Sequence, residues 1–270
     1  MKNIFIDNKD DRPIGVFDSG LGGLTVLNDL AKSFPNQSYI YLGDLANLPY
    51  GNKSKNNIIK CSVSCANFLI EKNVKGVIIA CNTSSSYAYK KLKDSLSIPV
   101  YDVINPCAES VSKSNLKKIA IIGTEKTIES NLYFDIIQSF NKKIQIYNVA
   151  CPLFVPIVEE GLENSSIATS IINMYLKNLK KLDIQGLVLG CTHYPVLIKS
   201  LKSYFNNSIK IFKSGKALAD KYEETGASVH NKNNPVKIKY YVTDLPDRFV
   251  KYGNKFSFQK IKKAELIKLW

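Results

Sequence analysis

The chain has few of the side chains that bind metals or read nucleic acids. It contains only two histidines, His193 and His230, and two arginines, Arg12 and Arg248. Two histidines supply too few ligands for a metal site, and readers of phosphates or bases favour arginine forks. The excess of 37 Lys+Arg over 23 Asp+Glu, a net charge of +14, is therefore nearly all lysine. We interpret it as a solvated lysine-rich surface and do not expect nucleic acid as the main partner.

Long apolar runs are also missing. None approaches the ~20 residues that cross a bilayer, and residues 1–12 show no apolar stretch followed by a cleavage site. These absences predict a cytoplasmic protein with no membrane partner. Cysteines are thinly spread over 270 residues, whereas disulfide frameworks are dense in short secreted chains. We expect free thiols at all six positions, Cys61, Cys65, Cys81, Cys107, Cys151 and Cys191.

What is present is an alternation of short apolar runs with helix-like segments. The apolar runs predict buried strands, and the segments with helical periodicity lie between them. Such alternation is typical of an α/β protein with parallel sheets covered on both faces. The predicted strands are 14–17, 39–42, 76–80, 119–123 and 186–190, and the predicted helices are 24–33, 56–71, 127–140 and 165–182.

Two segments resemble each other and indicate an internal repeat. Residues 76–83 end in Ala-Cys81-Asn-Thr, and residues 186–193 end in Gly-Cys191-Thr-His. Both cysteines directly follow a predicted strand, which is where functional groups gather in parallel α/β sheets. The repeat predicts two α/β domains, one of residues 1–105 plus 215–270 and one of residues 106–214, with one thiol each.

A pair of thiols suits one kind of chemistry in particular. Inverting an α-carbon requires removal of a proton from one face and its return to the other, and a thiolate and a thiol can do this. A lone cysteine after a strand is usually a small core residue, but the matched contexts favour function. Asn82, Thr83 and Thr192 stand beside the thiols as hydrogen-bond donors, and a helix beginning near Cys81 would favour its thiolate.

A glycine-rich turn follows the first strand. Gly20, Gly22 and Gly23 fit neither a dinucleotide fingerprint nor a P-loop, but they suggest close approach of the backbone to an anion. Asp18 could bind an ammonium group, assist a thiol, or cap the next helix. His193 leaves a second reading open, a Cys-His hydrolase, although a hydrolase would not need Cys81.

Taken together, these motifs closely resemble glutamate racemases, in the aspartate/glutamate racemase superfamily. The resemblance runs from about Pro13 to Lys221, and the last of its motifs is highly specific; no motif is recognised beyond Lys221. The matching stretches are residues 15–27, 43–44 with 49–51, 80–83, 151–161 and 189–195.

The resemblance implies two domains related by a pseudo-twofold axis, with the active site between them. It implies an isomerase that supplies D-glutamate for peptidoglycan, needs no pyridoxal phosphate, metal or nucleotide, and forms a homodimer. By similarity Cys81 deprotonates D-glutamate and Cys191 L-glutamate, Asp18 and His193 assist them, and Glu159 supports Cys191. The implied substrate contacts are Asp18, Ser19, Tyr50, Gly51, Asn82, Thr83, Thr192 and His193.

The chain departs from the family pattern in two places. Residues 84–86 are three serines where alanine is common in the family, and Asn105-Pro106-Cys107 replaces a more familiar Glu-Pro-Gly. Two alternatives also stay open: an aspartate or hydantoin racemase of the same superfamily, and a basic protein that binds nucleic acid or gyrase.

Overall fold

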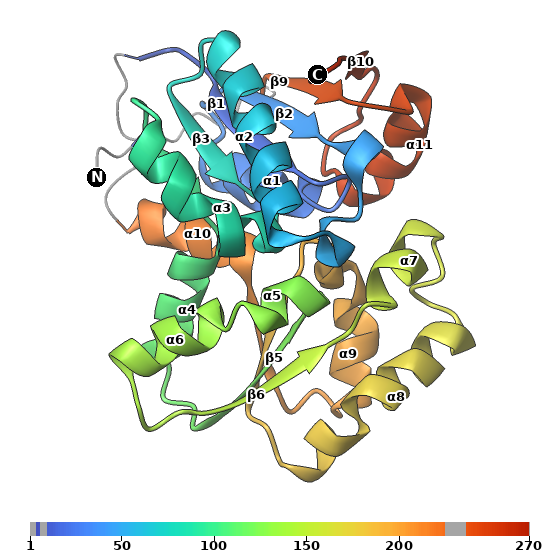
Figure 1. The fold of residues 1–270 in the computed structure, drawn as a ribbon. Helices are drawn as coiled ribbons and strands as arrows, with labels where there is room; N and C mark the ends of the chain where they lie inside the picture. Colours follow the sequence, from blue (N-terminus) through green and yellow to red (C-terminus); the bar gives the residue numbers. More distant parts are fainter. Residues whose placement is uncertain (1–3, 6–9, 225–235, 270) are drawn as a thin grey trace.

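The computed structural model describes residues 4–5, 10–224 and 236–269. Its framework is two parallel β-sheets of six and four strands with helices packed around them (Figure 1), which confirms the α/β prediction. The first sheet has the order β10-β9-β2-β1-β3-β4 and the second the order β6-β5-β7-β8. The first contains β1 (Ile14–Asp18), β2 (Tyr39–Gly43), β3 (Gly76–Ile79), β4 (Val100–Asp102), β9 (Ile238–Val242) and β10 (Glu265–Leu266). The second contains β5 (Lys118–Gly123), β6 (Gln145–Ala150), β7 (Gly186–Gly190) and β8 (Lys210–Lys213).

The central strands are apolar because both of their faces are covered. Every residue of β1, β2, β3 and β7 is buried, as expected for parallel strands between layers of helices. The edge strand β6 is half exposed, so its sequence lacks the continuous apolar run and was not predicted. The helices are α1 (Leu24–Ser33), α2 (Lys55–Glu71), α3 (Asn82–Ser95), α4 (Ile104–Ser112), α5 (Glu125–Glu129), α6 (Leu132–Phe140), α7 (Phe154–Glu159), α8 (Ser166–Lys181), α9 (Ile198–Tyr204), α10 (Ser214–Glu223) and α11 (Pro246–Phe256).

The predicted helix 127–140 is wrong as a single element. The chain forms α5 and then α6, separated at Ser130 and Asn131. Asn131 has φ 54°, in the left-handed region, which asparagine tolerates better than most residues. A residue in that conformation ends one helix and starts another, although the apolar periodicity continues through it.

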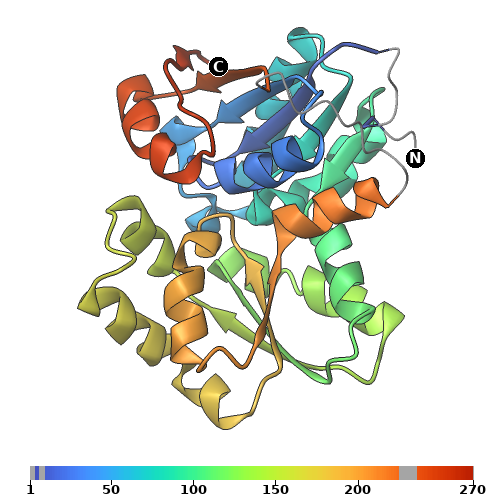
Figure 2. The same cartoon turned by 180° about the vertical axis from the view of Figure 1, so that it is seen from behind.

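Two helices join the sheets. α4 and α10 pack against each other between the two halves, and α10 also packs on α1 (Figure 2). At the start of α10, Lys213 Nζ lies 2.9 Å from Asp29 Oδ1 of α1. The strands of the first sheet fall within residues 14–102 and 238–266, and those of the second within 118–213. α4 begins at Ile104 and therefore runs across the predicted boundary at residues 105 and 106.

The C-terminal part, in which no motif is recognised, completes the first sheet. β9 pairs with β2 in parallel, with Tyr39 opposite Ile238, and α11 packs on α1. All six cysteines are buried free thiols. Among the described residues, no helix has the length and apolarity to cross a bilayer.

Candidate active site

Cys81 and Cys191 lie at the carboxyl ends of strands in different sheets and line the same cavity. β3 ends at Ile79 just before Cys81, and β7 ends at Gly190 just before Cys191. Within this cavity the two cysteines are only 5% and 6% exposed. Its lining residues are Ser19, Gly20, Leu48, Pro49, Tyr50, Gly51, Cys81, Asn82, Thr83, Thr124, Val155, Glu159, Cys191, Thr192 and His193.

The surroundings of Cys81 favour its neutral thiol. Cys81 is the N-cap of α3, and its Sγ accepts the backbone N–H of Ser84 at 3.5 Å. Its thiol also lies within donating distance of Ser19 Oγ, at 3.8 Å. Burial, with Asp18 as a second cause, nevertheless raises the pKa of Cys81 to about 12. The helix N-terminus was expected to favour the thiolate, but burial and the nearby carboxyl outweigh its field.

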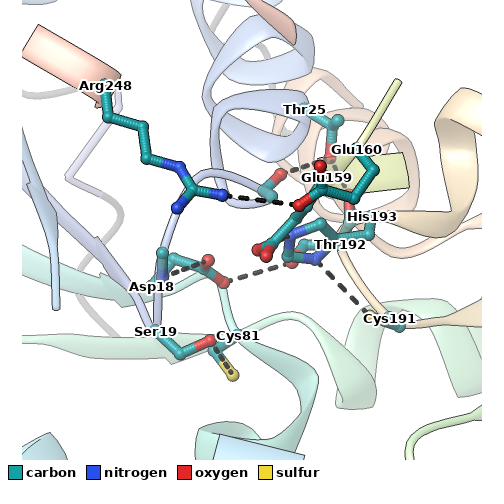
Figure 3. A network of polar contacts seen from close by, with 12 residues as sticks. Asp18, Ser19, Thr25, Cys81, Glu159, Glu160, Cys191, Thr192, His193 and Arg248 are labelled. Atoms are coloured by element: carbon teal, nitrogen blue, oxygen red, sulfur yellow. Dashed lines mark hydrogen bonds and ion pairs between the residues drawn. The ribbon is translucent and has the colours of Figure 1, made fainter. Parts of the chain in front are cut away.

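Two further side chains, His193 and Glu159, stand in line behind the Cys191 sulfur. His193 Nδ1 lies 3.9 Å from Cys191 Sγ, and His193 Nε2 lies 3.1 Å from Glu159 Oε1 (Figure 3). Burial lowers the pKa of His193, but Cys191 and Glu159 together raise it to about 10. The imidazole is therefore protonated at neutral pH, and it places a positive charge beside the Cys191 sulfur.

Asp18 lies behind the cavity and does not line it. Its Oδ1 accepts the N–H of Gly20 at 2.9 Å, and its Oδ2 accepts the hydroxyl of Thr192 at 3.2 Å (Figure 3). The side chain is fully buried, and burial raises its pKa. Asp18 is not the N-cap residue of α1, which is Gly23, but its carboxyl accepts the backbone N–H of Gly23 and so stabilises the start of that helix. Asp18 also holds the loop that carries Thr192.

The glycine-rich turn is required by contacts within the protein. A Cβ on Gly22 would lie 2.4 Å from Thr192 Oγ1 and 2.5 Å from His193 Nδ1, and a Cβ on Gly23 would lie 2.4 Å from the Asp18 Cβ. Thr25 at the start of α1 also donates to the Thr192 carbonyl at 2.9 Å. Instead of an anion, the backbone at these two positions closely approaches the side chains of Thr192, His193 and Asp18.

The other predicted substrate contacts all reach the cavity, but several of their side chains are already engaged. The Tyr50 hydroxyl donates to Asp44 Oδ2 at 2.5 Å. The side-chain oxygen of Asn82 accepts the Tyr133 hydroxyl at 2.8 Å, and its nitrogen donates to Ser214 Oγ at 3.3 Å. These bonds fix the walls and leave the free helix-terminal N–H groups of α3 to meet a ligand.

The sequence reasoning missed several lining residues. Thr124 directly follows β5, and the two cysteines were predicted as site residues because each follows a predicted strand. The same reasoning applied to Thr124 would have predicted it. Its Oγ1 lies 2.9 Å from Thr83 Oγ1. Val155, on α7, lies within the matching stretch 151–161, but its apolar side chain gives no sign of a place in the site. Within the described residues no cluster of three or more His, Cys, Asp or Glu side chains is arranged to hold a metal ion.

This combination of fold and paired thiols defines a class of isomerase. The family model described as Asp/Glu/Hydantoin racemase matches residues 19–222. Within that class, a glutamate racemase of Sulfurihydrogenibium sp. (strain YO3AOP1) is 46% identical over 90% of this chain and 92% of its own length. The chain belongs to the glutamate racemases, the enzymes that supply D-glutamate for peptidoglycan synthesis.

Solved structures agree with this assignment. A glutamate racemase from Francisella tularensis in complex with D-glutamate is 36% identical, with a TM-score of 0.86 over 96% of this chain and 98% of that one. The RacE1 glutamate racemase of Bacillus anthracis is 31% identical, with a TM-score of 0.88 over 96% of this chain and 98% of that one. These similarities confirm the prediction of a glutamate racemase with a two-part α/β fold.

Proposed function

We propose that this racemase interconverts L- and D-glutamate by moving the α-proton between Cys81 and Cys191, without a cofactor. The observation that carries the proposal is that two buried thiols, each at the carboxyl end of a strand in a different sheet, line one cavity. A planar intermediate between them would have one sulfur on each face. That is the arrangement that inversion of an α-carbon requires.

The two surroundings define which sulfur carries the proton at rest. The positive charge of His193, which Glu159 holds in place, lies beside the sulfur of Cys191, while burial keeps Cys81 as a thiol. In the direction from L to D, the Cys191 thiolate removes the α-proton, and the Cys81 S–H then gives its proton to the opposite face. The product complex has a thiol at Cys191 and a thiolate at Cys81. The reverse reaction restores the starting state, so no proton is lost.

The charge that develops on the substrate needs donors held in place before the reaction. The first N–H groups of α3 have no partner within the helix, and a helix N-terminus attracts anions. The hydroxyls of Ser19 and Thr83 add polar groups along the same wall, while the Thr192 hydroxyl donates to Asp18. We propose that these groups hold the substrate carboxylates, and that Asp18 acts through Thr192.

The test is loss of optical rotation from D-glutamate, followed by circular dichroism with no pyridoxal phosphate added. Racemisation in both directions is expected, with aspartate a poor substrate. Dependence on pyridoxal phosphate would contradict the mechanism. Comparable turnover of aspartate would move the assignment to the aspartate racemase alternative.

Three features beyond the chemistry are part of the same proposal. We propose domains of residues 1–105 plus 215–270 and of residues 106–214, a homodimeric assembly and a cytoplasmic location. The distribution of strands between the two sheets supports the domain division, and the family resemblance supports the other two. Light scattering coupled to gel filtration measures the mass of the assembly, and a monomer would contradict the dimer.

A further inference from the structure

Ser84 contains a buried hydroxyl that packing alone does not explain. It is the third residue of α3 and is fully buried, and its Oγ has no hydrogen-bond partner among the residues described. The serines that follow are satisfied, because Ser85 Oγ donates to the Ile79 carbonyl at 3.1 Å and Ser86 Oγ to the Asn82 carbonyl at 3.0 Å. Burying an unpaired hydroxyl costs free energy, so alanine would serve packing better at position 84.

The position of Ser84 directs it toward Cys81. Cys81 is the N-cap of α3, and the residue three positions later has a side chain that reaches back over the cap. The Ser84 N–H is already 3.5 Å from Cys81 Sγ. Burial and Asp18 raise the pKa of Cys81, and the nearness of the Ser84 backbone and side chain opposes that rise. Ser84 does not line the cavity, so it reaches the sulfur from behind the substrate.

We propose that the Ser84 hydroxyl donates a hydrogen bond to the Cys81 thiolate each time that thiolate forms. This inference rests on the proposed role of Cys81. While protonated, Cys81 donates to Ser19 Oγ, 3.8 Å away. Once its proton has gone to the substrate, the sulfur can only accept hydrogen bonds. The Ser84 O–H then donates one to it, and the proton stays on the Ser84 oxygen. Ser84 thereby supports Cys81 as His193 supports Cys191.

The substitution Ser84→Ala separates this role from a structural one. Hydrogen bonds to charged groups are strong, so kcat is expected to fall about tenfold, with KM little changed because Ser84 does not touch the cavity. L- and D-glutamate have equal free energies, so kcat/KM must fall by the same factor in both directions. Thermal stability should stay the same or rise, since an unpaired buried hydroxyl is removed. Ser86→Ala, two residues along the helix, is the matched control and should change neither activity nor stability.

A one-sided reaction locates the effect. Elimination of chloride from 3-chloroglutamate needs one base only and can be followed in Cys81→Ser and Cys191→Ser enzymes separately. Adding Ser84→Ala should slow elimination about tenfold in the Cys191→Ser enzyme, which depends on Cys81, and leave it unchanged in the Cys81→Ser enzyme. Equal slowing in both, or in neither, would overturn the proposal.

Titration of the thiol makes the test independent of turnover. Thiolate absorbance of the Cys191→Ser enzyme, minus that of the enzyme lacking both cysteines, reports the pKa of Cys81. Ser84→Ala should raise this pKa by about one unit, and Ser86→Ala should leave it unchanged. If the single-cysteine enzymes show no elimination at all, the two-thiol mechanism fails, but this titration still decides whether Ser84 acts on Cys81.

Discussion

Replacing Glu159 by glutamine removes one negative charge next to His193 and little else. The carboxylate is 17% exposed and lies 3.1 Å from His193 Nε2, and the amide oxygen of glutamine can still accept that hydrogen bond. The rise in the pKa of His193 from 6.5 to about 10 corresponds to about 5 kcal/mol in favour of the imidazolium. Cys191 and Glu159 together supply more than this net amount, because burial opposes them. A neutral acceptor retains part of this stabilisation. The free energy lost in Glu159→Gln should therefore be about 1.5–2 kcal/mol, which corresponds to a roughly ten- to thirtyfold change in kcat/KM.

The expected result is a fall of that size in kcat/KM near pH 8, measured by circular dichroism from either enantiomer. Because removal of the carboxylate lowers the pKa of His193, the alkaline decline in activity should move to lower pH. The effect on stability has a definite sign. The His193 pKa is raised on folding, so its stabilising contribution is complete below about pH 6.5 and disappears as the pH rises through about 10. Glu159→Gln should flatten this dependence.

Glu160→Gln is the control, because it makes the same charge change one residue further along. Glu160 is 65% exposed and lies 3.7 Å from Arg248, in a surface pair that contributes little. It should leave the pH profile unchanged. If both variants lose activity equally, or if Glu159→Gln loses activity with no movement of the alkaline limb, then Glu159 does not act through the charge of His193.

Three other predictions test the site and the surface. Cys81→Ser and Cys191→Ser should each abolish racemisation. Cys81→Ser should still eliminate chloride from L-chloroglutamate, and Cys191→Ser from the D-form. If one variant stops both eliminations while the other still racemises glutamate, the enzyme has a single nucleophile. Gly22→Ala should lower kcat/KM by at least about tenfold, because it displaces the side chains of Thr192 and His193. Gly20→Ala adds a methyl that meets only Leu48 at 3.8 Å and should be tolerated. Similar losses in both variants would contradict this prediction. Binding to DNA should be weak and vanish at moderate salt, and sequence-dependent binding that persists there would contradict a merely solvated lysine surface.

Local sequence signals predicted the buried strands and the positions of the thiols. The runs that became β1, β3 and β7 are apolar throughout because they are covered on both faces, and the polar residue after each one marks a strand end. Elements whose stability comes from distant contacts were not predicted. β9 has a place only because the edge of β2 is available to it, and nothing within residues 238–242 specifies that partner.

The same distinction holds within the site. Cys81 and Cys191 could be found because their surroundings repeat along the chain. The charge state of each could not, since it depends on side chains from elsewhere in the sequence. Asp18, 63 positions before Cys81, opposes its ionisation, and Glu159 reaches His193 from α7. A helix N-terminus beside Cys81 predicted a thiolate, and burial reversed that prediction.

The two thiols thus occupy equivalent positions in the backbone but opposite electrostatic surroundings, and the reaction gives a reason. If both sulfurs had the same surroundings, the resting enzyme would tend to hold two thiols or two thiolates, and neither form can both remove and return a proton. Burial and a carboxyl keep Cys81 as a thiol, whereas His193 places a positive charge beside Cys191. This asymmetry cannot bias the direction of the reaction, because the enantiomers have equal free energies. It determines only which enantiomer the resting enzyme is ready to deprotonate, and on the proposed roles that enantiomer is L-glutamate.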